Sequence, residues 1–292
     1  MTITRTQIIE ALNQQTSLPS IPDLVIRLEA ELRSEEPSMN DIAEIIEQDP
    51  ALSLRLLSVA NSAFYRRGRE VSTVRQAMSR LGFEEIRRLA VAAVLVNSYK
   101  DLGKENPTLF WGHSLAVAFA TKAVAGFCSV PLLQDAVTAS FTCGLLHDVG
   151  ILALNQLFSR EYQELRGKRV LEGGDINRLE TETFGIDHGE VGGELMRQWE
   201  LPEQMCKVVT LHHRPWECDP ADTETFQIVQ LIHISDFICN NQGYGRRRQI
   251  LPDAFEDSAW NALGLSLDHV PDIINMVRVE GERSQVFMNA FG

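Results

Sequence analysis

Apolar residues recur along most of this chain at the spacing of one face of an α-helix. Residues 50–61, PALSLRLLSVAN, show the pattern at Leu52, Leu56, Val59 and Ala60. This i, i+4, i+7, i+8 spacing is typical of an amphipathic helix with a buried stripe. No run of alternating β-branched residues is long enough to predict a strand. Helix after helix with short loops predicts an all-α fold.

Capping residues mark where several of these helices should begin. Ser38 precedes one apolar stretch, and Asp49 precedes another in which Pro50 takes the tolerated first position. Ser72 should open a further helix that breaks at Gly82. Asp187, followed three residues later by Glu190, matches a capping box. Further helices are expected at 84–97, 109–127, 133–146, 202–213, 224–240 and 267–291, with a loop at 167–175.

A polar segment near the middle of the chain predicts a boundary between two lobes. Residues 100–107, KDLGKENP, contain Gly and Pro, as an exposed turn or linker does. We therefore expect a two-lobed helical bundle with an N-terminal lobe at 1–106 and a C-terminal lobe at 107–292. No internal repeat or low-complexity segment interrupts either lobe.

Composition narrows the class of protein. Hydrophobic residues make up 44% of the 292 residues and charged residues 23%, which are ordinary values for a globular protein. No apolar run reaches the roughly 18 residues of a membrane span, and the N-terminus lacks the apolar core of a secretory signal. We expect a cytoplasmic protein without a membrane partner. The five scattered cysteines form no Cys-x-x-Cys pair and should be small buried side chains.

Charge argues against general nucleic-acid binding. Lys and Arg number 27 against 40 Asp and Glu, which gives a net charge of −13 and a surface that repels phosphate backbones. Arginine clusters occur at 66–69, 87–88 and 246–248. We interpret them as solvated helix ends and loops, with a phosphate site as the less favoured alternative.

The candidate chemistry lies in histidine and aspartate. His147 and Asp148 are adjacent at the end of an apolar helix, where the chain can turn both side chains toward one centre. Imidazole and carboxylate together suit Fe, Mn, Zn or Ni, and a carboxylate can also bridge two cations. Simpler alternatives stay open: a helix-end interaction for His147, a core role for His113, and a capping role for His188. Asp236, in an apolar helix, needs a cation or a hydrogen-bond donor if it is buried.

The order of these residues resembles the ligand series of HD-superfamily phosphohydrolases. Residues 144–150, GLLHDVG, closely resemble the core HD motif. On that resemblance, the candidate metal ligands are His113, His147, Asp148, His188, His212, His213 and Asp236. At least one of the paired His212 and His213 should serve. His233, one turn before Asp236, is expected to support the site rather than to ligate.

A second resemblance covers residues 18–215. The segments LPSIPDLVIRL, IAEIIEQDPALSLRLLSVANSAFY and VSTVRQAMSRLGFEEIRRLA, followed later by WELPEQM and LHHRP, are similar to the HDOD (HD-related output domain) family. The resemblance implies an HD-like C-terminal lobe in a bacterial signal-transduction module, generally without hydrolytic activity. It also implies a signalling protein as partner, with one or two transition-metal ions as optional cofactors and a small phosphorylated molecule as an optional ligand.

Three departures from the catalytic HD relatives matter for function. Ile151 stands where those relatives carry a lysine, and Arg214–Pro215–Trp216 follows the paired histidines in place of Gly-Tyr-Pro. Leu109, four residues before His113, is not a carboxylate, which argues for at most two metals. A non-catalytic signalling scaffold is therefore the favoured hypothesis. The alternatives are a metal-dependent phosphohydrolase acting on a nucleotide or other phosphate ester, and a purely structural helical protein.

Overall fold

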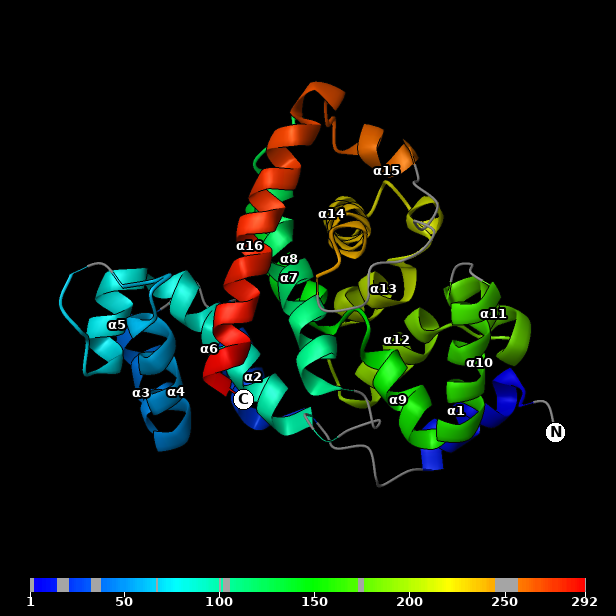
Figure 1. Ribbon diagram of the computed structural model, residues 1–292, viewed down its shortest axis with the longest axis horizontal. Helices are drawn as coiled ribbons and strands as arrows, with labels where there is room; N and C mark the ends of the chain where they lie inside the picture. Colours follow the sequence, from blue (N-terminus) through cyan, green and yellow to red (C-terminus); the bar gives the residue numbers. More distant parts are fainter. Residues whose placement is uncertain are drawn as a thin grey trace. The chain divides into compact units, whose positions relative to one another are not determined.

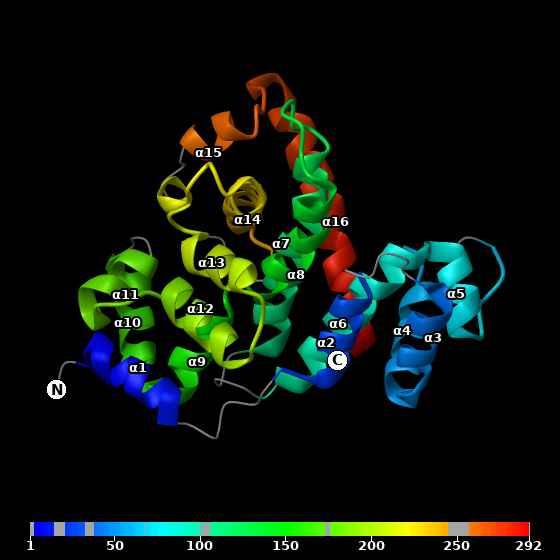
Figure 2. The ribbon, with the colours of Figure 1, turned by 180° about the vertical axis from the view of Figure 1, so that it is seen from behind.

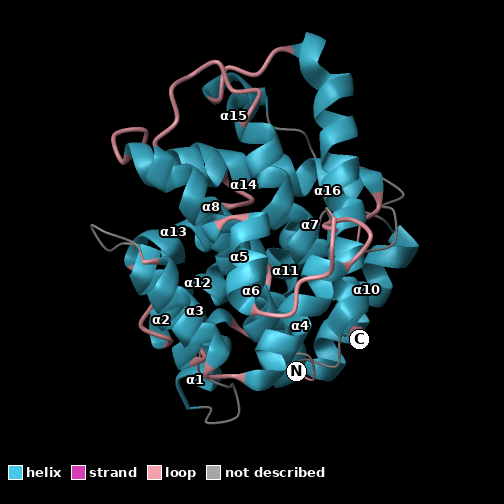
Figure 3. Cartoon of the chain, turned by 90° about the vertical axis from the view of Figure 1, so that its left-hand side faces the viewer, coloured by secondary structure: helices cyan, strands magenta, loops and turns pink. Residues whose placement is uncertain are grey.

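The computed structural model describes residues 3–14, 21–32, 38–66, 68–99, 101, 106–172, 176–244 and 257–291. Regular structure within these ranges is helical throughout, and none of it is strand (Figure 3). The all-α fold predicted from the apolar spacing is confirmed. The predicted cap at Asp187 is present, because its carboxylate accepts the Glu190 N–H at 2.8 Å.

The helices follow one another with short connections. The N-terminal half contains α1 (Arg5–Gln14), α2 (Asp23–Leu32), α3 (Met39–Glu47), α4 (Pro50–Asn61), α5 (Val74–Leu81) and α6 (Phe83–Tyr99). The middle contains α7 (Pro107–Ala125), α8 (Gln134–Leu146), α9 (Val149–Leu157), α10 (Ser159–Glu172), α11 (Ile176–Phe184) and α12 (His188–Gln198). The remainder contains α13 (Glu203–Leu211), η2 (Pro215–Glu217), α14 (Thr223–Gln242), α15 (Asp257–Ala262), η3 (Leu267–His269) and α16 (Val270–Phe291). The loop expected at 167–175 was wrong for residues 167–172, because α10 continues to Glu172, and residues 173–175 lie outside the described residues.

The chain forms two compact units, and neither is continuous in sequence. One unit comprises residues 19–100 and 282–292, and the other comprises 1–18 and 101–281. The sequence predicted a different division, into two continuous lobes, 1–106 and 107–292, with one boundary between them. In the structure α1 joins the larger unit, where it contacts α9 and α12 and buries Ile8 and Leu12. Helix α16 contributes residues to both units.

The smaller unit is organised around α6, which contacts α2, α3, α4 and α5 (Figure 1). Helix α6 is buried along most of its length, as its apolar composition predicted. The predicted caps at Ser38 and Asp49 are present: Asp49 Oδ1 accepts the N–H groups of Ala51 at 2.9 Å and Leu52 at 3.0 Å. The stripe on α4 faces the core.

Two expectations for the smaller unit were wrong. The cap of α5 is Thr73 rather than Ser72, since the Thr73 hydroxyl accepts the Gln76 N–H. Arg87 and Arg88 are buried in α6 rather than solvated, and Arg87 lies 3.3 Å from Glu84. Their helix is apolar on the other sides, so burying α6 buries these side chains as well. Arg67 and the cluster at 246–248 lie outside the described residues.

The larger unit surrounds α14 with α7, α8 and α13, and packs α12 against α9 and α13 (Figures 1 and 2). The seven candidate ligands lie in these helices or directly at their ends. Among the residues that the structure describes, one stretch is long and apolar enough to cross a membrane, Gln134–Leu157, but 83% of its most apolar window is buried inside the fold. This stretch is α8 and α9 with a turn between them, and buried core helices can be as long and apolar as a membrane span.

Candidate metal centre

The turn between α8 and α9 positions the His–Asp pair. His147 follows the last residue of α8, and Asp148 precedes the first residue of α9 with a non-helical backbone, φ −98° and ψ 7°. Gly150 then brings α9 unusually close to α12: a Cβ at this position would lie 1.9 Å from the His188 carbonyl oxygen. The absence of a side chain at Gly150 therefore allows Asp148 and His188 to meet.

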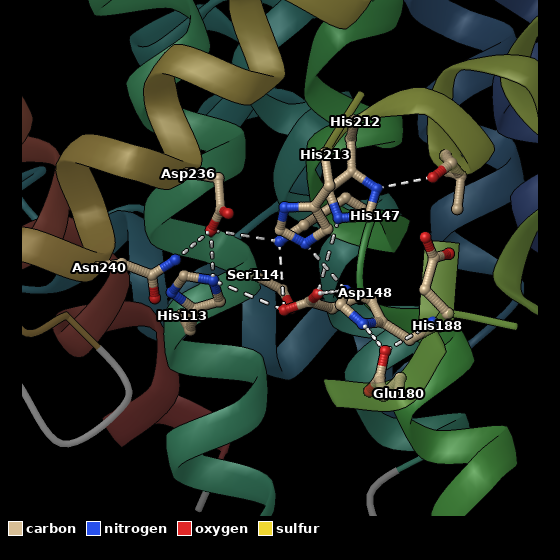
Figure 4. A network of polar contacts seen from close by, with 12 residues as sticks. His113, Ser114, His147, Asp148, Glu180, His188, His212, His213, Asp236 and Asn240 are labelled. Atoms are coloured by element: carbon tan, nitrogen blue, oxygen red, sulfur yellow. Dashed lines mark hydrogen bonds and ion pairs between the residues drawn. The ribbon is translucent and has the colours of Figure 1, made fainter. Parts of the chain in front are cut away.

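The other candidate ligands come from four further helices or helix ends. His113 lies in the middle of α7, His188 is the first residue of α12, and Asp236 lies in α14. His212 and His213 directly follow α13. All seven candidate ligands converge on one buried cluster, shown in Figure 4. Six of them are at least nine-tenths buried, and His213 is partly exposed.

One part of the cluster, which we call the Asp236 half-site, contains His113, His147, Asp236 and the Oδ2 atom of Asp148. Asp236 Oδ1 lies 2.9 Å from His113 Nε2 and 3.5 Å from His147 Nε2. Asp148 Oδ2 lies 3.2 Å from His147 Nε2 and 3.6 Å from His113 Nε2. Two imidazoles and two carboxylate oxygens thus face one point.

The other part, the His188 half-site, contains His188, His212, His213 and the Oδ1 atom of Asp148. Asp148 Oδ1 lies 3.2 Å from His188 Nε2 and 4.0 Å from His212 Nε2. His213 Nε2 lies 3.0 Å from His188 Nε2. Asp148 therefore belongs to both half-sites, with one carboxylate oxygen toward each (Figure 4).

Hydrogen bonds on the far side of the rings fix which imidazole nitrogen faces the cluster. His147 Nδ1 contacts the Gly144 carbonyl at 2.7 Å, and His212 Nδ1 contacts the Val209 carbonyl at 2.6 Å. A carbonyl oxygen only accepts, so each Nδ1 carries the proton. The Nε2 atoms of His147 and His212 are buried without a hydrogen bond of acceptable geometry among the described residues. Such a tautomer presents a lone pair on Nε2, which is how a neutral imidazole binds a metal.

The residues fit a transition-metal ion in both spacing and chemistry. Metal bonds of about 2.0–2.2 Å to nitrogen and oxygen place neighbouring ligand atoms about 3.0–3.5 Å apart. Most of the contacts between ligand atoms in the two half-sites lie in or next to this range. Each half-site could hold one ion. Imidazole with carboxylate suits Fe, Mn, Zn or Ni. The role of these seven residues as ligands stays a prediction.

Burial and neighbouring charges shift the pKa values of the clustered histidines. Burial opposes protonation of His147, but the carboxylates of Asp148 and Asp236 outweigh it and raise the pKa of His147 to about 9. Against the same effect of burial, Glu180 and Asp148 raise the pKa of His188. Burial, together with His147 and His188, lowers the pKa of His212 to about 3. The carboxylates thus favour the protonated forms of His147 and His188, whereas burial and the neighbouring imidazoles favour the neutral form of His212.

Sequence reasoning missed two polar residues that hold ligands in place. Asn240 donates to Asp236 Oδ1 at 2.9 Å from one turn along α14. Glu180, in α11, accepts from His188 Nδ1 at 2.6 Å (Figure 4). The signal for Asn240 was its i+4 spacing from Asp236 on the same helix. Glu180 gave no such signal, because it lies on a separate helix.

Three further residues singled out in the sequence have defined environments. His233 Nδ1 donates to the His212 backbone carbonyl at 2.8 Å, and so contacts the chain beside a candidate ligand. Ile151 is buried in α9 and offers no charge. Arg214 lies 3.6 Å from Asp187 and 3.8 Å from Glu217, so carboxylates surround its guanidinium.

Comparison with known proteins gives a consistent family. The model of the HDOD domain family matches residues 18–215. An HDOD domain protein of unknown function from Geobacter sulfurreducens superposes with a TM-score of 0.78 at 23% identity, over 95% of this chain and 98% of that one. A candidate signal transduction protein from Marinobacter aquaeolei gives 0.74 at 21% identity, over 98% and 64%. A candidate phosphohydrolase from Shewanella amazonensis gives 0.72 at 21% identity, over 98% of each chain.

The curated relatives are considerably longer than the matched region. An uncharacterised protein from Treponema pallidum is 22% identical over 196 residues, which are 67% of this chain and 37% of that protein. The chain thus spans only about a third of that relative's length. At these identities the solved structures establish the fold alone.

Proposed function

Because the chain belongs to the HDOD domain family, we propose that it is a non-hydrolytic signal-transduction module that holds one or two transition-metal ions at its buried centre. The metal would act as a structural cross-link among helices, and the surface would recognise a signalling protein. The proposed setting is the bacterial cytoplasm. All five cysteines are free, which is consistent with a reducing compartment.

The observation that carries this proposal is the arrangement of imidazoles around Asp148. His147 and His212 use Nδ1 on a backbone carbonyl and leave Nε2 toward the cluster. Both rings thereby direct Nε2 toward the carboxylate of Asp148, at 3.2 Å for His147 and 4.0 Å for His212. This arrangement favours a ligand set over the alternative of unrelated packing histidines.

Ile151, Arg160 and Arg214 offer no cationic side chain that is free to bind a phosphate at this centre, which argues against hydrolysis. Phosphoryl transfer needs groups that stabilise charge in the transition state, and one such group is commonly worth about 100- to 1000-fold in rate. Ile151 occupies the position of the lysine in catalytic relatives and is apolar and buried. Arg160, one candidate substitute, is 85% exposed and pairs with Glu164. Arg214, the other, lies 3.6 Å from the Asp187 carboxylate and 3.8 Å from the Glu217 carboxylate, which compete with a phosphate for its guanidinium.

A metal-dependent phosphohydrolase acting on a nucleotide or another phosphate ester is the second candidate. The complete set of seven candidate ligands favours it, since a scaffold does not require every ligand. Bound metal would supply Lewis acidity toward a phosphate group. The partly exposed His213 marks the side from which a small phosphorylated ligand would approach.

Elemental analysis and a hydrolysis assay on the same sample distinguish the two functions. We expect purified protein to contain up to two equivalents of Fe, Mn, Zn or Ni, and to hydrolyse neither a generic phosphodiester nor a cyclic dinucleotide above the rate of free metal. His147→Ala should lower the metal content. Turnover at rates typical of enzymes that disappears in His147→Ala would refute the scaffold proposal. Protein that binds no transition metal under any loading condition would refute the metal centre.

A further inference from the structure

The histidines of the cluster differ in what holds their outer nitrogen. The Nδ1 atoms of His113, His147 and His212 contact backbone carbonyl oxygens, at 3.2 Å, 2.7 Å and 2.6 Å. His188 instead directs Nδ1 at a carboxylate, Glu180 Oε2, at 2.6 Å. The same oxygen accepts the backbone N–H of His188 at 2.8 Å. Of these four rings, His188 is the one whose outer nitrogen contacts a carboxylate side chain.

Glu180 is itself held in one orientation. Its side chain is fully buried, and its second oxygen accepts from the Tyr162 hydroxyl at 2.6 Å. Tyr162 is also buried, in α10. Both carboxylate oxygens therefore have a protein donor, and neither needs solvent. A buried carboxylate without an Arg or Lys partner is costly unless a nearby cation compensates it.

The position of this charge matters because the two half-sites have unequal ligands. The Asp236 half-site contains a carboxylate of its own in addition to its share of Asp148. The His188 half-site contains three imidazoles and only the shared carboxylate. A divalent ion in the His188 half-site would thus meet less negative charge. A carboxylate behind a ligating imidazole raises the basicity of the ring and fixes its tautomer.

We propose that Glu180, oriented by Tyr162, is a positioning residue that supplies the His188 half-site with the negative charge its own ligands lack. Through His188, Glu180 strengthens binding of an ion in that half-site and leaves the Asp236 half-site almost unaffected. The inference rests on the proposed metal centre, and it adds selectivity between the halves. A purely structural Glu180 would stabilise the fold without favouring either half.

A cobalt(II) titration of the full chain tests this proposal. Visible absorption of bound cobalt, with a competing chelator, measures the affinity of each equivalent. Glu180→Gln keeps the size of the side chain but removes its charge. We expect it to weaken one equivalent by about 10- to 100-fold and to leave the other within about twofold. Tyr162→Phe should weaken the same equivalent by a smaller factor, because Glu180 remains but loses one donor.

Matched controls separate this role from a general effect. Glu182→Gln removes a carboxylate from the same helix, but Glu182 is 55% exposed and pairs with Arg178, so both affinities should be unchanged. Equal weakening of both equivalents, or of neither, by Glu180→Gln overturns the inference and leaves the metal centre standing. Wild-type protein that binds no cobalt overturns both. If Glu180→Gln fails to fold, Tyr162→Phe decides the question by the same criterion.

Discussion

At the scale of single residues, Asp148 has a position that no other candidate ligand shares. Its two carboxylate oxygens face different half-sites, at 3.2 Å from His147 Nε2 and 3.2 Å from His188 Nε2. A histidine offers one nitrogen to a cluster and cannot bridge in this way. Two ions held close together would also repel each other, and a shared carboxylate reduces that repulsion. Binding of two ions would therefore depend on this residue.

We predict that Asp148→Ala lowers the metal content from two equivalents to one at most. The substitution removes one ligand from each half-site and the negative charge between them. Elemental analysis after loading with excess metal and gel filtration measures the change. Asp135→Asn, on the exposed start of α8, is the control and should retain wild-type content. Full loading of the Asp148→Ala protein would contradict the bridging role.

The histidine pKa values predict how the metal-free protein responds to pH. The pKa of His147 is raised from 6.5 to about 9, so its contribution to stability is present below pH 6.5 and is lost as the pH rises through about 9. The pKa of His212 is lowered to about 3, so its contribution is present above pH 6.5 and is lost as the pH falls toward 3. The stability of metal-free protein should therefore peak near pH 6.5.

Urea unfolding of chelator-treated protein at pH 5, 6.5 and 9 checks this expectation, with the highest midpoint at 6.5. Metal affinity should show a different dependence, because His147 must lose its proton before it can ligate. We expect affinity to rise between pH 7 and pH 9, by at most about tenfold per pH unit for each proton released. Release of protons on metal addition, measured in weak buffer, should accompany it. An affinity that is independent of pH would show that His147 does not ligate.

At the scale of elements, local sequence signals predicted most helices because the signals act locally. Asp49 caps α4 and Asp187 caps α12, as their spacing to the first helical N–H groups required. Other features depend on distant parts of the chain and gave no local signal. The burial of Arg87 and the anchoring of His188 by Glu180 both follow from which helices pack together. Periodicity within one helix does not contain that information.

The crossing of α9 and α12 gives a prediction about one glycine. Gly150→Ala should destabilise the protein by about 1–3 kcal/mol or more, the range for overpacking, because the added Cβ would meet the His188 carbonyl and the Gly192 nitrogen. Separating the helices would also move Asp148 away from His188. We therefore expect lower metal affinity along with a lower midpoint of denaturant unfolding.

Gly167→Ala, in α10, is the control variant, because the added Cβ has open space there. Gly167 is exposed within α10, and a Cβ added there would meet nothing within 4 Å, so alanine should stabilise by about 0.5–1 kcal/mol. Comparison of the two variants separates helix propensity from packing. A Gly150→Ala protein as stable as wild type, with unchanged metal affinity, would show that the close crossing does not position the site.

At the scale of the whole molecule, the candidate site joins segments that are far apart in the sequence. Its ligands extend from His113 to Asp236 and come from α7, the α8–α9 turn, α12, the end of α13 and α14. Resemblance to HD proteins gave these residues in order, but residue patterns alone left simpler roles open: a core role for His113, a helix-end interaction for His147 and a cap for His188. The division into half-sites, and the place of Asp148 between them, required the three-dimensional structure.

Because all candidate ligands lie in the unit of residues 1–18 and 101–281, metal should stabilise that unit. An ion that binds only the folded state stabilises by about 2.7 kcal/mol at a free concentration about 100 times its Kd. The four tryptophans, Trp111, Trp199, Trp216 and Trp260, all belong to the same unit. Tryptophan fluorescence therefore reports its unfolding selectively, whereas far-ultraviolet circular dichroism reports both units.

We predict that metal raises the midpoint of thermal unfolding followed by tryptophan fluorescence, and that a chelator reverses the increase. The circular dichroism transition should then contain one component that follows the fluorescence and another, from residues 19–100 and 282–292, that responds less to metal. Asp148→Ala is the internal control, because its fluorescence midpoint should lose most of the metal dependence while its metal-free value stays measurable. A fluorescence midpoint that is the same with excess metal and with chelator would mean that the clustered histidines and aspartates do not bind metal in the folded chain.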